Sequence, residues 1–539
     1  MSSFELEGLC PLTAPAALAR AAAIAPEVEA IVAPGGRITF GALAGEVARI
    51  RASLVAAGIG RGDHVGLCLG NGPRWVAIFL ALGSIGAVTV PVNTRFRGEE
   101  MAYVLGQAKV RWLFIADRFL RVDFIAMLRG ICPGIDTGLP DSALPQLQGV
   151  VVLGDNVPAA TMGWDDFLRA GEGQVAPVTA RPEDPLLIQY TSGTTSFPKG
   201  VLLTHRSMCA NGFFSGGRMG LRIADRFHSA RPFFHVAGST LSILSCLQHV
   251  CTLVTMDRFE PAEALRLMEE ERCTHFSGND TMALMLLNHP DRAYRRLHLR
   301  GAWAAASPSI VKRVIEELGA RECVVGYGLS EASPNISQSC WWEDEDIRIS
   351  GRMLPEPGVT VRIRHLETGE DCPPGVDGEI LVRGWNVMLG YFDKPEETAA
   401  TLDEDGWLAT GDLGNLDASG RLAFCGRAKD IVRVGGENVS PAEVEDVLHR
   451  HPAIRQAVVV GVPDARLVEV PCAFIIRNEG HACAEDEIIA WSKEKMAGFK
   501  VPRYVRFVEG FEAIGMTESS KIQKKKLAAH AVQLLGLAG

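Results

Sequence analysis

The chain has 539 residues, of which 47% are hydrophobic and 22% charged, and its formal net charge is -10. This length exceeds what one hydrophobic core usually organises, and the composition is that of a globular enzyme rather than of a disordered or fibrous chain. The acidic balance argues against a general affinity for nucleic acid, whose phosphates require a basic face. We therefore expect two or more globular domains. Any anionic ligand must bind at a local site that is arranged for it.

The cysteines and the hydropathy of the chain indicate where in the cell the protein is located. Thirteen cysteines are scattered without a C-x-x-C pair, so we expect reduced thiols in a cytoplasmic protein and no structural zinc site. Residues 1–10 lack the basic and apolar regions of a signal peptide. The eighteen residues 75–92 carry no charge, but glycine, serine and proline interrupt them. We expect a buried helix followed by a strand there, and no transmembrane segment.

The part of the chain before Val359 alternates between helical and extended patterns. Leu43, Val47, Ile50 and Leu54 recur at helical spacing. Apolar runs typical of buried strands are found at 64–69, 87–90, 150–153 and 323–325. Strands that alternate with helices favour a parallel sheet covered by helices. The fold class we predict is α/β, with a large N-terminal domain of helix-covered parallel sheets.

The pattern changes after Val359 to short strands separated by turn signals such as Pro373-Pro374-Gly375. This texture predicts a β-rich subdomain at the end of the body. After Asp430 come a strand-like run, the turn Gly435-Gly436 and a helix that begins near Pro441. We expect a small α+β C-terminal domain there.

The segment 190–200, Tyr-Thr-Ser-Gly-Thr-Thr-Ser-Phe-Pro-Lys-Gly, lies between the apolar runs 186–188 and 201–203. Glycine lets backbone amides approach an anion, the Ser/Thr hydroxyls add donors, and Lys199 adds a positive charge. The segment therefore suits triphosphate oxygens, although a plain Ser/Thr/Gly hairpin has the same composition. A Walker A loop is disfavoured, because Pro198 precedes the lysine and Gly200 follows it.

Further segments follow this loop in a fixed order. They are G-Y-G-L-S-E at 326–331, W-L-A-T-G-D-L-G at 407–414, G-R-A-K-D at 426–430 and T-E-S-S-K-I-Q-K at 517–524. Together with the loop they resemble the motifs of the adenylate-forming superfamily, which contains acyl-CoA synthetases, beetle luciferases and peptide-synthetase adenylation domains. The chain departs from the family pattern at Ser196, where the loop usually has glycine, and at Gly515 and Ser520, which replace a proline and a glycine.

The resemblance implies ATP, Mg²⁺ and coenzyme A as ligands. Tyr327 is expected to stack on adenine, Ser330 to bond the α-phosphate, Asp412 to accept both ribose hydroxyls, and Glu331 to hold Mg²⁺. Thr191, Glu331 and Lys521 form the implied catalytic set, in which Lys521 bridges the acid carboxylate and the α-phosphate. The nucleotide-binding residues are completed by Ser192, Gly193, Thr194, Thr195, Lys199, Ser307, Gly326, Gly328 and Arg427.

The resemblance also implies a division of the chain at a hinge. Lys429 falls at the position where the family's C-terminal domain rotates between an adenylating and a thioester-forming pose. We therefore expect an N-terminal adenylate-forming domain at 1–428 and a mobile C-terminal domain at 429–539. Gly435 and Gly436 would line the pantetheine tunnel in the second pose.

On the acid side, the segment P-F-F-H-V-A-G at 232–238 resembles the aromatic and histidine segment that borders the acyl pocket in CoA ligases. His235 is expected as a gate or wall of this pocket, with Trp303, Ala304 and Ala305 as further lining. No aspartate in 232–238 could pair with an α-amino group, so an amino-acid substrate is disfavoured. Asn279 or Asp280 is expected to contact a polar substrate group, with the alternative that Asp280 caps a helix at 282–287.

These expectations define one main hypothesis and two alternatives. The main one is an acid–CoA ligase that forms acyl-AMP and pyrophosphate, then acyl-CoA and AMP, from a medium-chain, alicyclic or aryl acid. The first alternative is an acyl-AMP ligase that loads a carrier protein. The second is an α/β-hydrolase with Ser330 as nucleophile, although G-L-S-E-A at 328–332 ends in alanine instead of glycine. The sequence leaves the acid and the oligomeric state open, a homodimer included.

Overall fold

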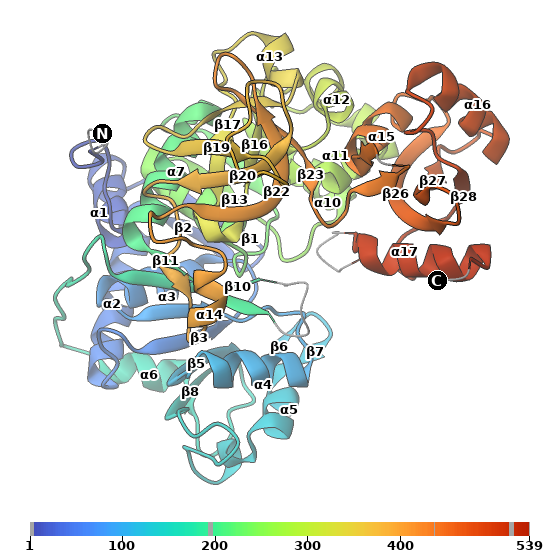
Figure 1. Cartoon of the computed structure of the whole chain (residues 1–539). Helices are drawn as coiled ribbons and strands as arrows, with labels where there is room; N and C mark the ends of the chain where they lie inside the picture. Colours follow the sequence, from blue (N-terminus) through green and yellow to red (C-terminus); the bar gives the residue numbers. More distant parts are fainter. Residues whose placement is uncertain (1–4, 192–197, 436, 517–521, 538–539) are drawn as a thin grey trace.

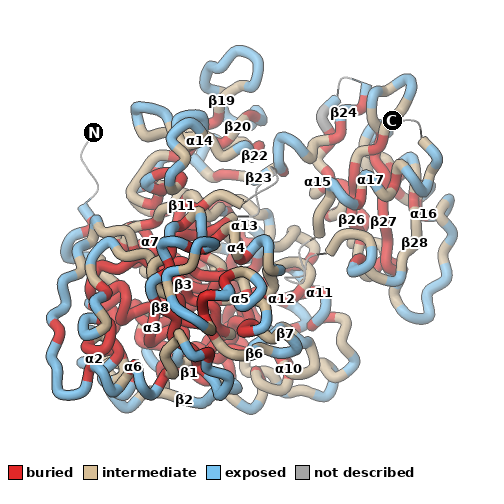
Figure 2. Tube along the Cα trace, turned by 90° about the horizontal axis from the view of Figure 1, so that it is seen from below, coloured by how far each residue is buried: buried red, intermediate tan, exposed pale blue. Residues whose placement is uncertain are grey.

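The computed structural model describes residues 5–191, 198–435, 437–516 and 522–537. It contains a large N-terminal body and a smaller C-terminal domain, which lies to one side of the body (Figure 1). Buried segments fill the body, and a separate set follows the long strands of the C-terminal domain (Figure 2). The predicted α/β class is confirmed.

One sheet of the body has eight strands in the order β21-β11-β10-β4-β3-β5-β8-β9. From β10 to β9 neighbouring strands are parallel, and β11 pairs antiparallel with both β10 and β21. The strands are β3 (His64–Cys68), β4 (Val88–Pro91), β5 (Trp112–Ala116), β8 (Gly149–Leu153), β9 (Met162–Gly163), β10 (Pro185–Thr191), β11 (Lys199–Thr204) and β21 (Gly390–Tyr391).

The other sheet of the body has thirteen strands in the order β19-β20-β22-β23-β18-β17-β16-β15-β14-β12-β13-β1-β2. Strands β13, β12, β14, β15 and β16 are parallel, and the strands beyond β16 are antiparallel. The β-rich part predicted after Val359 thus continues this sheet. The strands are β1 (Glu29–Ala33), β2 (Gly36–Thr39), β12 (Arg226–Ser229), β13 (Thr252–Val254), β14 (His275–Asn279), β15 (Gly301–Ala305), β16 (Glu322–Gly328), β17 (Asn335–Gln338), β18 (Arg352–Pro355), β19 (Thr360–Arg364), β20 (Gly378–Arg383), β22 (Leu408–Leu416) and β23 (Leu422–Arg427).

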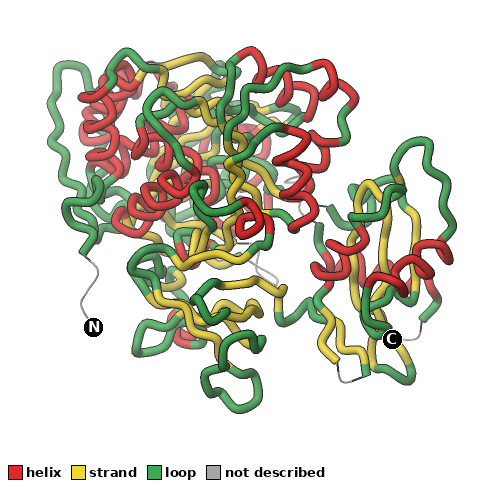
Figure 3. The backbone as a smooth tube through the Cα atoms, turned by 90° about the horizontal axis from the view of Figure 1, so that it is seen from above, coloured by secondary structure: helices red, strands yellow, loops and turns green. Residues whose placement is uncertain are grey.

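Helices lie on both sides of the strands in the body (Figure 3). They are α1 (Ala14–Ile24), α2 (Phe40–Ala56), α3 (Pro73–Ser84), α4 (Gly98–Gln107), α5 (Phe124–Ile131), α6 (Trp164–Ala170), α7 (His205–Met219), α8 (Val236–Gly238), α9 (Ser245–His249), α10 (Pro261–Glu270), α11 (Asp280–Leu287), α12 (Pro308–Leu318), α13 (Glu345–Ile349) and α14 (Pro395–Ala399). The predicted periodicity is confirmed in α2, where Leu43, Val47, Ile50 and Leu54 are buried and Thr39 caps the first turn.

Helix α3 explains the charge-free stretch at 75–92. It is buried from Trp75 to Ser84 and contacts β1 of one sheet and β3 of the other, so this part of the helix is enclosed on all sides. The chain then enters β4, as the sequence predicts. Among the described residues, no helix is long and apolar enough to cross a membrane.

The C-terminal domain has its own sheet, in the order β25-β24-β27-β26, with β28 paired to β27. Its two hydrophobic clusters contain only residues from Val432 onward. The elements are β24 (Val432–Val434), β25 (Glu437–Val439), β26 (Ile454–Asp464), β27 (Val468–Arg477), β28 (Tyr504–Phe507), α15 (Pro441–Leu448), α16 (Glu485–Lys495) and α17 (Lys524–Leu535).

Buried histidines make the stability of this fold sensitive to acid. His228 on β12 is fully buried, and neither of its ring nitrogens has a hydrogen-bond partner in the described part of the chain. Burial lowers the pKa of His228 to about 4. The unfolded chain therefore binds a proton between about pH 6.5 and pH 4 that the folded chain excludes, so stability falls as pH falls through this window.

We expect His228→Leu to reduce this acid sensitivity. The loss of unfolding free energy between about pH 7 and pH 5 should shrink by roughly 2 kcal/mol, because one buried titrating group is removed. Melting temperatures at both pH values, measured by calorimetry on wild type and variant, check this. An equal loss in both proteins would contradict it.

Candidate active site

The ends of β10 and β11 frame the predicted phosphate loop. Thr191 pairs with Lys199 across the two strands, and the Lys199 ammonium lies 4.8 Å from the centre of the Tyr391 ring on β21. The loop between them lies outside the described residues. The roles predicted for Ser192, Gly193, Thr194 and Thr195 therefore stay predictions, as does the effect of Ser196.

A cluster at the carboxyl end of β16 joins two distant parts of the chain. The Tyr327 hydroxyl donates to Asp412 Oδ2 at 2.9 Å, across 85 residues of sequence. The Tyr327 ring stacks on Phe424, with centroids 5.1 Å apart and planes at 23°. Arg427 faces Asp412 in the register of β22 and β23, with its Nε 3.5 Å from Asp412 Oδ1. Three of the sequence-predicted nucleotide residues therefore meet in one place.

Asp412 in this cluster is a buried carboxylate with spare acceptor capacity. Its residue is 5% exposed, and burial raises its pKa while Arg427 and the Tyr327 hydroxyl oppose that shift. A carboxylate offers about four lone-pair positions, and these two neighbours occupy about two of them. The others can accept further hydroxyl donors, and the exposed ring of Phe424 lies beside them.

A second contact links β16 to the phosphate-loop strands. Glu331 lies in a short 3₁₀ turn, Ser330–Ala332, and its Oε1 accepts from the Tyr391 hydroxyl at 2.9 Å. Burial, followed by the charge of Glu331, raises the pKa of Tyr391, which keeps the hydroxyl a donor. The sequence analysis missed Tyr391. Its contact with Glu331 spans 60 residues, and no local pattern marks it.

The turn after β16 also bears on the hydrolase alternative. A nucleophile elbow places its serine between a strand and a helix. Here Gly328 ends the strand, Ser330 begins a three-residue 3₁₀ turn, and the antiparallel strand β17 follows. Within the described ranges no histidine is hydrogen-bonded to the Ser330 hydroxyl. The geometry therefore gives no support to Ser330 as a nucleophile.

The predicted acid-side residues lie beside this cluster, at the carboxyl ends of neighbouring parallel strands. Trp303 on β15 is buried, and its indole N–H donates to Gln338 Oε1 at 3.1 Å. Its ring lies against Gly326, where a Cβ atom would come within 2.6 Å of Trp303 Cζ2. Only glycine at 326 leaves room for this indole. Ala304 is buried, and Ala305 is exposed.

His235 and Ser307 border the same strand ends. His235 precedes the short helix α8, and its backbone N–H donates to Pro232 O. Ser307 precedes α12, and its backbone N–H donates to Asp280 Oδ1 at 3.0 Å. Burial raises the pKa of Asp280 to about 7.

The helix cap predicted at Asp280 is wrong. Asn279 caps α11, because its Oδ1 accepts from Met282 N at 2.9 Å. Asp280 is the first residue of the helix, and its carboxylate instead holds the loop that carries Ser307.

The C-terminal domain meets the body through α15. Asp446 Oδ1 accepts from Ser309 N at 3.0 Å and so caps the first turn of α12. Lys429, the predicted hinge, is exposed between β23 and β24. Lys521 and Gly436 lie outside the described residues. Just beyond Lys521, the Lys524 ammonium is 2.7 Å from Glu445 on α15.

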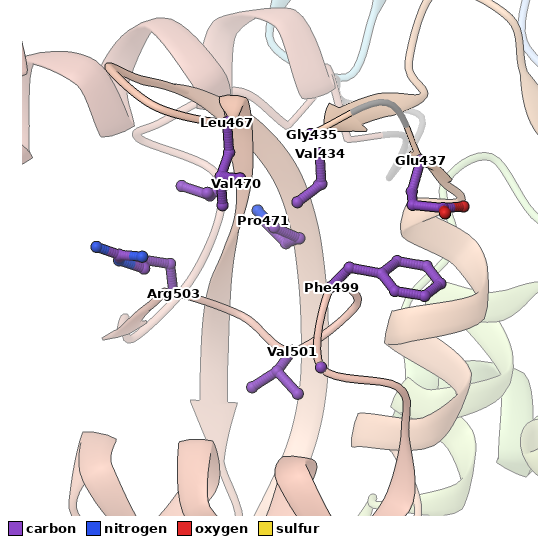
Figure 4. A pocket seen from close by; sticks show the side chains of 10 residues that line it. Val434, Gly435, Glu437, Leu467, Val470, Pro471, Phe499, Val501 and Arg503 are labelled. Carbon is purple, nitrogen blue, oxygen red and sulfur yellow. The ribbon is translucent and has the colours of Figure 1, made fainter.

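Gly435 lines a pocket of about 390 Å³ that belongs to the C-terminal domain alone (Figure 4). Its φ of +58° suits glycine. The other lining residues are Val434, Glu437, Leu467, Val470, Pro471, Gly498, Phe499, Val501 and Arg503. In this arrangement of the two domains, the pocket is therefore separate from the Tyr327 cluster.

Comparison with known proteins agrees with this geometry. Residues 18–392 match the model of the AMP-binding enzyme family, and residues 443–521 match that of the AMP-binding enzyme C-terminal domain. A 3-[(3aS,4S,7aS)-7a-methyl-1,5-dioxo-octahydro-1H-inden-4-yl]propanoyl:CoA ligase from Mycobacterium tuberculosis is 37% identical, over 96% of this chain and 99% of the relative. The medium-chain acyl-CoA ligase ACSF2, mitochondrial, from Danio rerio is 34% identical, over 95% and 87%.

A solved structure extends the similarity to three dimensions. The anthranilate CoA ligase AuaEII in complex with anthranoyl-AMP superimposes with a TM-score of 0.86 and 26% identity, covering 98% of this chain and 99% of that one. One family model thus lies in the body and the other in the C-terminal domain, and the relatives cover both parts. The chain therefore belongs to the AMP-binding enzyme family, a group of adenylate-forming enzymes that includes acyl-CoA synthetases.

Proposed function

We propose that this enzyme is an ATP-dependent acid–CoA ligase. The acid's carboxylate attacks the α-phosphorus of ATP and pyrophosphate leaves. The thiol of CoA then attacks the acyl carbon of the mixed anhydride, and AMP leaves. The observation that carries this proposal is the junction of buried Tyr327 and Asp412 with exposed Arg427, because it offers an aromatic face, a hydroxyl acceptor and a cation in one place.

The nucleotide roles follow from this junction. Asp412 uses its remaining lone pairs for the ribose hydroxyls, and Arg427 contacts the ribose or phosphate. Phe424 covers one face of Tyr327 at 5.1 Å, so adenine stacks on the other face. Thr191, Lys199 and Ser330 border the space for the phosphates. The family resemblance assigns phosphate binding to Ser192, Gly193, Thr194 and Thr195 of the loop as well. Gly326, Gly328 and Ser307 lie at the adjoining strand ends.

The residues present also fit Mg²⁺. This ion is held by one or two carboxylates, with phosphate oxygens and water as its other ligands. Glu331 supplies one carboxylate, positioned by the Tyr391 hydroxyl near Lys199. The described residues contain no group of three or more His, Cys, Asp or Glu side chains that could hold a metal by themselves. When bound with ATP, Mg²⁺ neutralises phosphate charge.

The second half-reaction requires the C-terminal domain to move. We place the domain boundary between 428 and 429, with Lys429 as the hinge. Gly435 lies here on a pocket made only of C-terminal residues, so the domain must turn about the hinge for Gly435 and Gly436 to line a tunnel for pantetheine. The contact between Asp446 and Ser309 breaks in that motion.

The acid is a medium-chain, alicyclic or aryl acid rather than an α-amino acid. The similar proteins include a medium-chain acyl-CoA ligase, a ligase for an oxygenated alicyclic propanoyl group and an anthranilate CoA ligase. His235, Trp303, Ala304 and Ala305 line the pocket for this acid in our proposal. An acyl-AMP ligase that loads a carrier protein shares all these features and is the alternative.

A panel assay tests the proposal. Purified enzyme is given ATP, CoA and acids from each class, with and without Mg²⁺, and pyrophosphate and CoA thioester are both measured. We expect both products from one class of acid and neither product without Mg²⁺. Pyrophosphate without thioester would favour a carrier-protein acceptor, and neither product with every acid would contradict the proposal.

A cytoplasmic location and a homodimer remain predictions. All thirteen cysteines are free thiols in the structure, which supports a reducing compartment. Light scattering on the purified enzyme measures the oligomeric state directly.

A further inference from the structure

Arg231 is an arginine at the acid side of the site that the sequence motifs do not mark. It lies two residues after the end of β12, and its guanidinium carbon lies 4.2 Å from the centre of the Trp303 ring. One guanidinium nitrogen is 3.4 Å from Gly278 O on β14, a long hydrogen bond. The side chain therefore extends across the carboxyl ends of the parallel strands β12, β14 and β15.

Within the described part of the chain, no acidic side chain forms an ion pair with Arg231. Among the described residues, no carboxylate lies within 4.0 Å of its guanidinium, whereas other arginines of the body pair with acids, as Arg226 does with Glu29 and Glu271. Burial lowers the pKa of Arg231 to about 9, so the group stays charged near neutral pH. A half-buried guanidinium without an anion is costly, and a ligand that supplies oxygen acceptors removes that cost.

The surroundings of Arg231 hold it in place. Trp303 is fixed by its bond to Gln338 Oε1, which also accepts from Ser215 and Asn335. The Arg231 carbonyl accepts from Asn71 Nδ2 at 3.0 Å. The indole and these bonds therefore present a preorganised fork of donors, as binding sites for carboxylates do.

The position of Arg231 relative to the Tyr327 cluster indicates how the acid is oriented in its proposed pocket. Trp303 contacts Arg231 and also lies against Gly326, which directly precedes Tyr327 on β16. Ligands of parallel sheets bind outside the carboxyl ends of the strands. An acid whose carboxylate meets the nucleotide near Tyr327 therefore extends along Trp303 toward Arg231.

We propose that Arg231 binds an oxygen acceptor, a second carboxylate or a ketone, at the end of the acid remote from the carboxylate that is activated. This deepens the ligase function proposed above and rests on it. It narrows the substrate class to acids that carry such a group at a fixed distance from the reacting carboxylate. A purely structural role, in which Arg231 only supports Trp303, predicts no dependence on the remote group.

The test compares acids of matched chain length that end in a methyl group, a ketone or a carboxylate. For wild type we expect kcat/KM to be about tenfold to a hundredfold higher for one or both oxygen-bearing series than for the methyl series, with an optimum at one chain length. The two oxygen-bearing series tell the carboxylate and the ketone apart. Arg231→Leu should abolish or reverse this preference, with the KM for ATP unchanged.

Two further variants separate recognition from folding. Arg231→Lys keeps the charge but loses the planar fork, so it should retain an intermediate preference for the carboxylate series. Arg222→Leu is the matched control. Exposed Arg222 makes the same kind of contact with a tryptophan, because its guanidinium carbon lies 5.2 Å from the centre of the Trp341 ring, but it is not part of the proposed acid site. It should behave as wild type.

An equal loss of activity of Arg231→Leu with all three series would overturn the inference, as would a wild type that prefers the methyl series. Should wild type activate none of the acids, the ligase proposal itself fails. The inference is then decided by thermal shift: it requires that the oxygen-bearing acids raise the melting temperature of wild type but not of Arg231→Leu.

Discussion

Lys521→Ala is expected to lower the rate of acyl-adenylate formation by about 10²- to 10³-fold, because it removes the cation proposed to bridge the acid carboxylate and the α-phosphate as negative charge builds in the transition state. Thioester formation from supplied acyl-adenylate and CoA should be largely spared. The two half-reactions are measured separately, as ATP–pyrophosphate exchange and as thioester release.

The described residues around position 521 support this expectation. Met516 and Ile522 pair across the intervening segment, and Lys524 reaches Glu445 on α15, next to the Asp446 that contacts the body. The residues on either side of the segment that carries Lys521 therefore lie near the boundary between the domains. Lys526→Ala is the matched control, because Lys526 is exposed on α17, and it should leave both half-reactions unchanged. An equal loss in both half-reactions would count against the assignment of Lys521.

Asp412→Ala is expected to raise the KM for ATP by about tenfold to a hundredfold, because it removes the acceptor proposed for the ribose hydroxyls and leaves the buried Tyr327 hydroxyl without its partner. The KM for the acid should change much less. Steady-state kinetics with ATP and acid varied in turn measure both constants, and a competition assay with AMP checks nucleotide binding without turnover.

Asp417→Ala controls for damage to the hairpin that carries Asp412. Asp417 forms the turn between β22 and β23, where its carboxylate accepts from Ser419 and Arg421. The loss of the Asp417 carboxylate should lower the thermal stability but leave the KM for ATP unchanged. Similar ATP constants for wild type and Asp412→Ala would refute the ribose role, and a matching rise in Asp417→Ala would assign the effect to the hairpin.

Local sequence signals predicted much of the scaffold. The periodicity of α2 and the apolar run of β3 depend on contacts that each segment repeats along its own length, so they are visible without the rest of the chain. The motifs also named Thr191, Lys199, Asp412 and Arg427, but the structure supplied their cross-strand pairing, Thr191 opposite Lys199 and Asp412 opposite Arg427.

The errors and omissions have a common physical origin. Asn279 rather than Asp280 caps α11, because the Asp280 carboxylate accepts instead from the backbone N–H of Ser307, which lies between β15 and α12. Tyr391 and Arg231 went unnoticed because neither belongs to a local pattern, and their contacts with Glu331 and Trp303 cross between strands that lie far apart in sequence. Apolar patterning fixes which face of a strand is buried but not which strands become neighbours.

The sequence by itself determined the class of fold, the order of the motifs and the types of side chain available for a nucleotide and an acid. Only the tertiary structure decided that Tyr327 meets Asp412, that Glu331 meets Tyr391, and that Arg231 faces Trp303 without an acidic partner among the described residues. The reason is that these contacts depend on strand order and register, which are set by packing across the whole core and not by any one segment.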